Sequence, residues 1–138
     1  MPFAPIVGAL EEADEPRLAS ALARAARASD PRAPEVDDAW TPLAHALLGL
    51  ARRPDDILGP RTRDGFPGLA STVVESVLEA ADPIQAARYL RIFFERVKQP
   101  AVYVRLVASD PQALRRIVAV LGASAFVGLL DGITFQNN

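Results

Sequence analysis

The fold is decided by the stretch DPIQAARYLRIFFERVKQPAVYVRLVASDPQALRRIVAVLG, residues 82–122, in which apolar runs with helical spacing alternate with proline. The Asp-Pro pair at 82–83 has the pattern of an N-cap followed by a first helical turn, because aspartate accepts from free backbone N–H groups and proline fits that turn. The pair at 110–111 repeats the pattern, and Pro100 separates two apolar runs. The stretch therefore predicts three consecutive helices, over residues 82–98, 101–108 and 111–121.

Each of these helices carries apolar side chains at intervals of three and four residues, the spacing that places them on one helix face. In the first helix, Arg88, Arg91 and Glu95 occupy the opposite face. Gly122 follows the third helix in the C′ position, where glycine commonly ends a helix. The residues predicted to face inward are Leu90, Phe93, Phe94 and Val97 in the first helix, Tyr103, Leu106 and Val107 in the second, and Leu114, Ile117, Val118 and Leu121 in the third.

The same periodicity extends to the N-terminal part of the chain and predicts helices over residues 16–29, 40–53 and 68–81. In the second of these, Thr41 followed by Pro42 reads as the N-cap and first turn. The inward residues are predicted to be Leu18, Ala21, Leu22 and Ala25 in the first helix, Leu43, Leu47 and Leu50 in the second, and Ala70, Val73, Val74, Val77, Leu78 and Ala81 in the third.

We therefore expect an all-α fold, an array of about six short helices in a single domain over residues 1–138. N-terminal helices over 1–53 would be joined to a helical core over 68–130 by a loop over 54–67, which has three prolines, two glycines and five charged residues. Ser124 would cap a last short helix over 125–130. The tail over 131–138 shows no helical pattern and is expected to be irregular.

Composition limits the classes of protein that fit this chain. No cysteine is present, so disulfide scaffolds and zinc sites with thiolate ligands are excluded, and a single histidine, His45, does not supply the imidazoles of most catalytic zinc sites. No apolar run reaches the roughly 18 to 20 residues that span a bilayer. The N-terminus has acidic residues where a signal peptide would have basic ones. We expect a cytoplasmic protein with no membrane partner.

Charge is distributed unevenly, but not in the manner of a nucleic-acid-binding domain. Residues 1–83 carry 8 basic and 14 acidic side chains, whereas residues 84–138 carry 7 basic and 3 acidic ones. The excess of basic over acidic side chains in residues 84–138 is small beside the concentrated basic surfaces that bind nucleic acids. Residues 114–130 have the helix, turn and helix order of a helix-turn-helix motif. The second helix, which would begin at Ala125 and Phe126, has no polar side chains that could contact the edges of DNA bases. We expect no nucleic-acid partner.

No set of residues with a recognisable catalytic spacing occurs in the sequence. The adjacent acid pairs Asp37–Asp38 and Asp55–Asp56 are expected to be solvated loop and cap residues. His45, between Leu43 and Leu47 on a predicted helix, is expected to be a partly buried imidazole with its hydrogen bonds satisfied. The chain contains no nucleophile elbow, glycine-rich phosphate loop or dinucleotide-binding turn. We therefore predict no catalytic, cofactor-binding or metal residues.

Residues 89–128 follow a distinctive order of aromatic, turn and apolar positions. They are an aromatic-rich helix from Tyr89, then Pro100, Tyr103, Leu106, Val107, Ser109, Asp110 and Pro111, then Leu114, Arg115 and Arg116, and finally Leu121, Gly122, Ser124 and Phe126. In this order the stretch resembles the glutamine synthetase adenylyltransferase family, bifunctional enzymes in which a helical segment precedes a nucleotidyltransferase domain. The resemblance implies transfer of AMP from ATP to a tyrosine of glutamine synthetase, and its phosphorolytic removal, with ATP and magnesium as the family's cofactors.

The chain departs from that family in two ways. The family's catalytic signature, of the type Gly-x-Ser-Asp-x-Asp, is absent from all 138 residues, so no catalytic residue is transferred. After Val127 the family continues into helix, whereas this chain reads Gly128-Leu129-Leu130-Asp131, as a truncated or frame-shifted form would. We expect a helical N-terminal portion that is inactive alone and packs against a nucleotidyltransferase domain or glutamine synthetase, with an exposed, self-associating patch over 126–133.

Two other readings remain open from the sequence. A stand-alone helical protein-interaction module would be monodisperse and would bury its C-terminal apolar residues. A small enzyme with an unrecognised site would bind magnesium and ATP specifically on its own.

Overall fold

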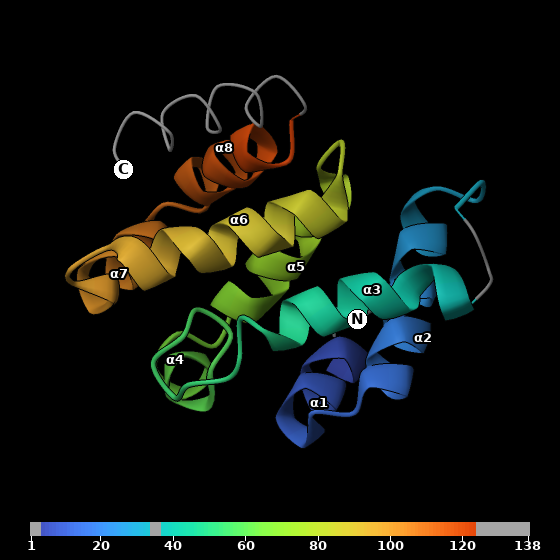
Figure 1. Ribbon diagram of the computed structural model, residues 1–138, viewed down its shortest axis with the longest axis horizontal. Helices are drawn as coiled ribbons and strands as arrows, with labels where there is room; N and C mark the ends of the chain where they lie inside the picture. Colours follow the sequence, from blue (N-terminus) through green and yellow to red (C-terminus); the bar gives the residue numbers. More distant parts are fainter. Residues whose placement is uncertain (1–3, 34–36, 124–138) are drawn as a thin grey trace.

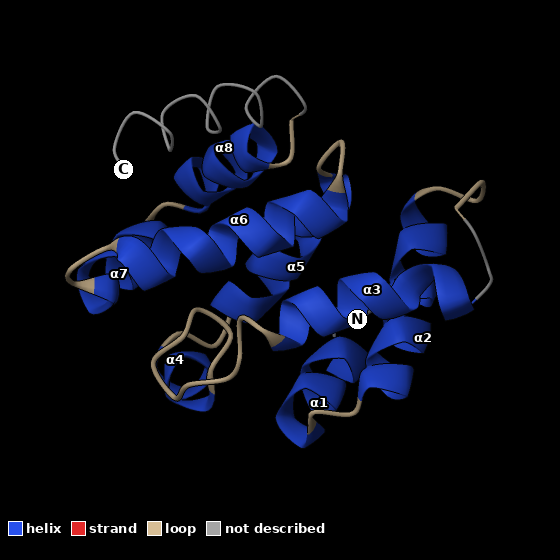
Figure 2. Ribbon diagram, viewed as in Figure 1, coloured by secondary structure: helices blue, strands red, loops and turns tan. Residues whose placement is uncertain are grey.

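The computed structural model describes residues 4–33 and 37–123, and within these ranges the chain is all-α, with eight helices and no strand (Figure 2). The predicted fold class is therefore confirmed. The helices are α1 (Ala4–Glu12), α2 (Glu15–Ser29), α3 (Asp37–Leu48), α4 (Pro60–Gly65), α5 (Leu69–Glu79), α6 (Pro83–Arg96), α7 (Pro100–Ser109) and α8 (Pro111–Leu121).

The helices pack as two groups that meet where α3 lies against α6 (Figure 1). In the first group α2 packs against α1 and, most extensively, against α3. In the second group α8 packs against both α5 and α6, and α7 lies at the far end of α6, against α8 (Figure 1). The contact between α3 and α6 brings together residues about forty positions apart in the chain.

Three aspartates begin helices as N-caps. The side chains of Asp82 and Asp110 accept hydrogen bonds from the backbone N–H groups of Gln85 and Ala113, at 3.1 and 3.2 Å. Asp14 caps α2 in the same way, accepting from the backbone N–H of Arg17 at 3.2 Å. Each helix has proline in its first turn. The caps predicted at Asp82 and Asp110 are confirmed.

One continuous apolar core runs through both groups of helices. The predicted stripes of α2, α5, α6 and α8 supply most of it. α1, which periodicity did not predict, adds Ile6, Ala9 and Leu10. Fully buried large side chains include Leu18, Leu22, Leu47, Val73, Val74, Val77, Leu90 and Leu114.

The start of α3 differs from the prediction. The helix begins at Asp37, so Thr41 is not its N-cap and Pro42 lies inside it. It ends at Leu48 rather than at residue 53, although Leu50 is buried as predicted. Proline removes a backbone donor from a helix. Burial of Leu43, Ala44 and Leu47 in the core stabilises the helix across Pro42. This contribution from tertiary packing is not visible in the local sequence pattern.

The segment 54–67, predicted to be a loop, contains α4 and is anchored in the core. Ile57 and Leu58 are fully buried. The backbone N–H of Leu58 donates to the carbonyl of Leu50 at 3.0 Å. At Gly59 a Cβ atom would lie 2.1 Å from the carbonyl oxygen of Arg53, so only glycine fits this turn. The two apolar residues at 57 and 58 were too short a run to reveal the anchor by periodicity.

The inward face of α7 was predicted wrongly in part. Val104 and Val107 are buried, whereas Leu106 is 58% exposed and Tyr103 40% exposed. α7 is apolar around most of its circumference, so its sequence does not determine which face turns inward. The contacts of α7 with α8 and with the end of α6 determine which face turns inward. At the end of α6 the ring of Tyr103 packs edge-on against that of Phe93, with 5.7 Å between the ring centroids.

Gly122 ends α8 as predicted, but for a different reason. Its φ is −89°, outside the left-handed region. A Cβ atom there would lie 2.7 Å from the Cβ of Ala80 and 3.1 Å from that of Ala86. Glycine thus permits the end of α8 to approach the turn between α5 and α6.

The predictions for the helix over 125–130, the tail over 131–138 and the patch over 126–133 lie outside the described residues. Within the described ranges, no helix has the length and hydropathy needed to cross a bilayer.

Candidate functional site

The adjacent acids Asp55 and Asp56 face two different arginines rather than one shared site. Asp55 faces Arg61, with 3.2 Å between Oδ1 and Nη1, and Asp56 turns instead to Arg53. The side chains of Asp37 and Asp38 lie outside the structural description. Among the side chains that the structure describes, no three His, Asp or Glu residues are grouped as metal ligands would be.

His45 is exposed rather than partly buried as predicted. Its side chain is 79% exposed, and Nδ1 lies 3.2 Å from Oε2 of Glu15. A residue two positions away on a helix is rotated by about 200°, so His45 points away from the side that buries Leu43 and Leu47. The pair joins the outer side of α3 to the start of α2.

A groove of about 660 Å³ runs between α3 and α6, and we call it the α3–α6 groove. Its apolar lining includes Ala46, Leu48, Ala51 and Ile92, all of them half-buried. Its charged lining comprises Arg88 and Arg91 of α6, Arg52 in the turn after α3, His45 of α3 and Glu15 at the start of α2.

Two of these arginines have no acidic partner within the structurally described part of the chain. Arg52 and Arg88 are exposed and form no ion pair there. The acids of the groove region are already engaged: Glu15 by His45, Glu95 by Arg91 and Asp56 by Arg53. The groove therefore combines apolar surface with two guanidinium groups available to an anionic ligand.

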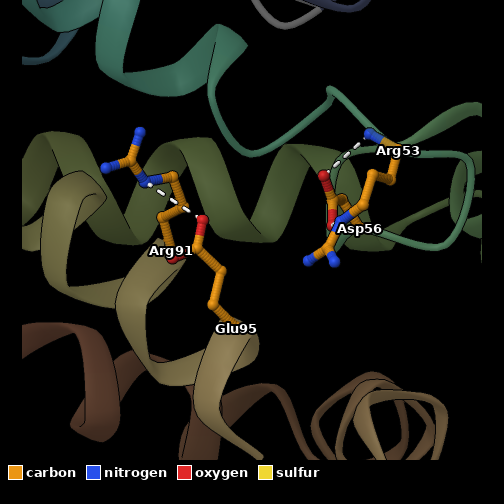
Figure 3. Close-up of polar contacts among 4 residues, drawn as sticks. All are labelled: Arg53, Asp56, Arg91 and Glu95. Atoms are coloured by element: carbon orange, nitrogen blue, oxygen red, sulfur yellow. Dashed lines mark hydrogen bonds and ion pairs between the residues drawn. The ribbon is translucent and has the colours of Figure 1, made fainter.

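Arg91 is held across the end of α3. A Cβ atom at Gly49 would lie 3.4 Å from its Cδ and 3.5 Å from its Nη1, so the arginine stem passes directly over that glycine. Its Nε lies 3.6 Å from Oε1 of Glu95 (Figure 3). A cation is favoured beside the carbonyl-rich C-terminus of a helix. Arg91 thus joins α6 to the end of α3 and closes one side of the groove.

A second hollow, of about 310 Å³, lies beyond Gly49 and shares Arg52 and Arg91 with the groove. Here Asp56 organises the loop: its carboxylate accepts from the backbone N–H of Arg53 at 2.8 Å and from the Nε of Arg53 at 3.0 Å (Figure 3). This pair stabilises the turn after α3, and the charge of Arg53 is neutralised within it.

A separate surface is formed by the exposed apolar residues of α7. Val102, Tyr103 and Leu106, which we call the α7 apolar face, are 53%, 40% and 58% exposed. Residues four apart are neighbours on a helix, so Val102 and Leu106 lie one turn apart on one side. On the opposite side Val104 and Val107 are buried.

Neither surface was identified from the sequence. The groove is assembled from helices distant in the chain, and its arginines appeared only as parts of polar helix faces. The signal for the α7 face was present, since a helix rich in apolar residues on all sides requires burial on more than one. The chain matched no family model, no curated protein and no solved structure with which it was compared.

Proposed function

We propose that this chain is a non-catalytic helical module that packs against another protein domain, as the helical N-terminal portion of a glutamine synthetase adenylyltransferase-like protein. The observation that carries the proposal is the α7 apolar face. Burying a valine or leucine side chain contributes about 1.5 to 3 kcal/mol, so leaving two of them exposed side by side forgoes stability that a partner can supply. Exposed apolar residues gathered on one face mark interaction surfaces.

The partner follows from the resemblance at residues 89–128. A nucleotidyltransferase domain that holds ATP and magnesium, or glutamine synthetase itself, would cover the α7 apolar face. AMP transfer would then occur in the partner domain, because phosphoryl chemistry requires carboxylates that hold magnesium, and the Gly-x-Ser-Asp-x-Asp signature is absent here.

The test is a binding measurement with purified glutamine synthetase and, separately, a purified adenylyltransferase catalytic domain. We expect the double variant V102E/L106E to bind at least about tenfold more weakly than the unmodified chain, since it places charge in an apolar interface. R105A, an exposed change on the same helix, should bind as the unmodified chain does. If neither protein binds, the proposed partners are wrong.

A stand-alone helical interaction module is the second candidate, and the described part of the chain favours it in one respect. The N-termini of α2, α6 and α8 are capped by side chains, and one apolar core joins both groups of helices. Light scattering after gel filtration distinguishes the candidates. A severed adenylyltransferase portion should self-associate, whereas a stand-alone module should be monodisperse.

Two further measurements complete the comparison. A Gly-x-Ser-Asp-x-Asp coding stretch in any forward frame beyond the codon for Asn138 would support the adenylyltransferase proposal. Specific binding of magnesium and ATP by the isolated chain would favour a small enzyme instead.

A further inference from the structure

We propose that the α3–α6 groove is a docking site for an acidic amphipathic helix supplied by another protein. The groove is lined by residues other than those of the α7 apolar face, so the two surfaces are separate and this inference does not depend on the proposed function.

The shape of the groove suits a helix. On the α3 side its lining runs from Pro42 to Leu48, roughly 9 Å at 1.5 Å per residue. It continues past the end of that helix through Gly49, Ala51 and Arg52. α3 and α6 form its two sides and the junction of α1 and α2 adds Leu10 and Ala13. An amphipathic helix binds such a groove by placing apolar residues from successive turns into it.

The lining supplies the apolar half of the recognition. Ala46 and Ala51 are short side chains on the α3 side, and Leu48 and Ile92 flank them. All four are half-buried, so each retains apolar surface that a docked helix would remove from water. A simple inorganic anion would leave that surface exposed, which favours an amphipathic helix as the occupant.

Charge supplies the polar half of the recognition and determines that the partner helix is acidic. Arg52 and Arg88 have no acidic partner in the described residues, and Arg91 stands between the groove and the second hollow. Glutamates on the polar edge of a docked helix would accept hydrogen bonds from these guanidinium groups, and arginine pairs with carboxylates in a fixed, two-pronged geometry. A basic helix would instead meet like charge.

The experiment uses two fluorescent helical peptides with identical leucine positions, one with glutamate and one with lysine at the polar positions. We expect the unmodified chain to bind the glutamate peptide at least about tenfold more tightly than the lysine peptide, and more weakly as salt is raised. R52A/R88A should lose about tenfold in affinity for the glutamate peptide, whereas the matched control R105A/R116A, also two exposed arginines, should not.

Charge reversal gives a readout that loss of folding does not imitate. R52E/R88E should reject the glutamate peptide and gain affinity for the lysine peptide. V102E/L106E, which tests the α7 apolar face, should bind the glutamate peptide normally. Failure of the unmodified chain to prefer the glutamate peptide, equal loss in R105A/R116A, or competition by inorganic phosphate alone as strong as by the peptide would each overturn the proposal.

Discussion

The side chain of Gln85 caps the C-terminus of α8 from the first turn of α6, because its Nε2 donates to the carbonyl oxygen of Leu121 at 3.0 Å. The same nitrogen lies 3.1 Å from the carbonyl oxygen of Ala123. The backbone N–H of Asp82 donates to the carbonyl of Gly122 at 3.1 Å, which adds a third contact. Helix termini leave carbonyl groups without intrahelical partners, and here α6 supplies donors for those of α8.

Replacing Gln85 by alanine is therefore expected to destabilise the protein by about 1 to 2 kcal/mol, since two part-buried carbonyls lose a donor. Urea unfolding followed by circular dichroism measures the change. The exposed Gln112, in the first turn of α8, provides the matched control, and Q112A should change the free energy of unfolding by less than about 0.5 kcal/mol. Equal effects in the two variants would show that Gln85 does not act as a cap.

Leu106 of α7, predicted to be buried, is exposed, whereas Leu114 of α8 is buried. L114A removes a fully buried side chain from α8 and should cost about 2 to 5 kcal/mol. L106A removes a side chain that is largely in solvent, so its cost should stay below about 0.5 kcal/mol. Thermal or urea unfolding of both variants checks this. A cost for L106A close to that of L114A would mean that Leu106 is buried in solution, as the sequence predicted.

Helical periodicity predicted the long amphipathic helices well, because each of them buries one well-defined stripe. In α6, Leu90 and Phe94 are buried and Phe93 packs against the core, as does Val97 directly after the helix, in agreement with their spacing. The Asp-Pro pairs likewise determined where α6 and α8 begin, since both cap and first turn are local properties.

Local pattern failed where burial depends on contacts between distant segments. Thr41 and Pro42 have the local pattern of a helix start, yet α3 continues through Pro42 because Leu43 and Leu47 are buried in the core. Ile57 and Leu58 form too short a run to show that they enter the core. The α3–α6 groove could not be predicted at all, because it depends on Arg91 lying over Gly49, forty-two positions earlier.

Arg63 ties the segment after α3 to the N-terminal helix, although the sequence placed it in a loop. Its side chain is only 11% exposed. The Nε of Arg63 donates to the carbonyl oxygen of Leu58 at 3.0 Å, and its Nη1 lies 3.3 Å from Oε1 of Glu11 in α1. R63A should cost about 1 to 3 kcal/mol, because it leaves the Leu58 carbonyl without this charged donor. Hydrogen exchange should show faster exchange at the Leu58 amide, which bonds to Leu50.

Arg61 is the control for that variant. It lies two residues away, its side chain is largely exposed, and it pairs with the surface acid Asp55. Exposed ion pairs contribute about 0 to 1 kcal/mol, so R61A should unfold near the unmodified midpoint. If R61A and R63A were equally mild, the tether between α1 and α4 would be a surface contact only.

Ala13 gives a prediction of opposite sign, in which removing a side chain stabilises the protein. It adopts a φ of +52° between α1 and α2, the left-handed region that costs an L-residue about 1 to 2 kcal/mol. Its N–H donates to the carbonyl of Leu10, and that of Asp14 to the carbonyl of Ala9, the pair of bonds that ends a helix in a Schellman motif. Glycine is the usual residue at this position because it lacks the clash.

A13G is therefore expected to stabilise the protein by about 1 kcal/mol, measured as an increase in the urea midpoint at unchanged slope. The same substitution at the exposed Ala119, in the interior of α8, should destabilise by about 1 kcal/mol, because there glycine adds only backbone entropy to the unfolded state. A loss of stability in both variants would show that residue 13 does not hold the left-handed conformation, and that the turn which places α1 beside the α3–α6 groove is built differently in solution.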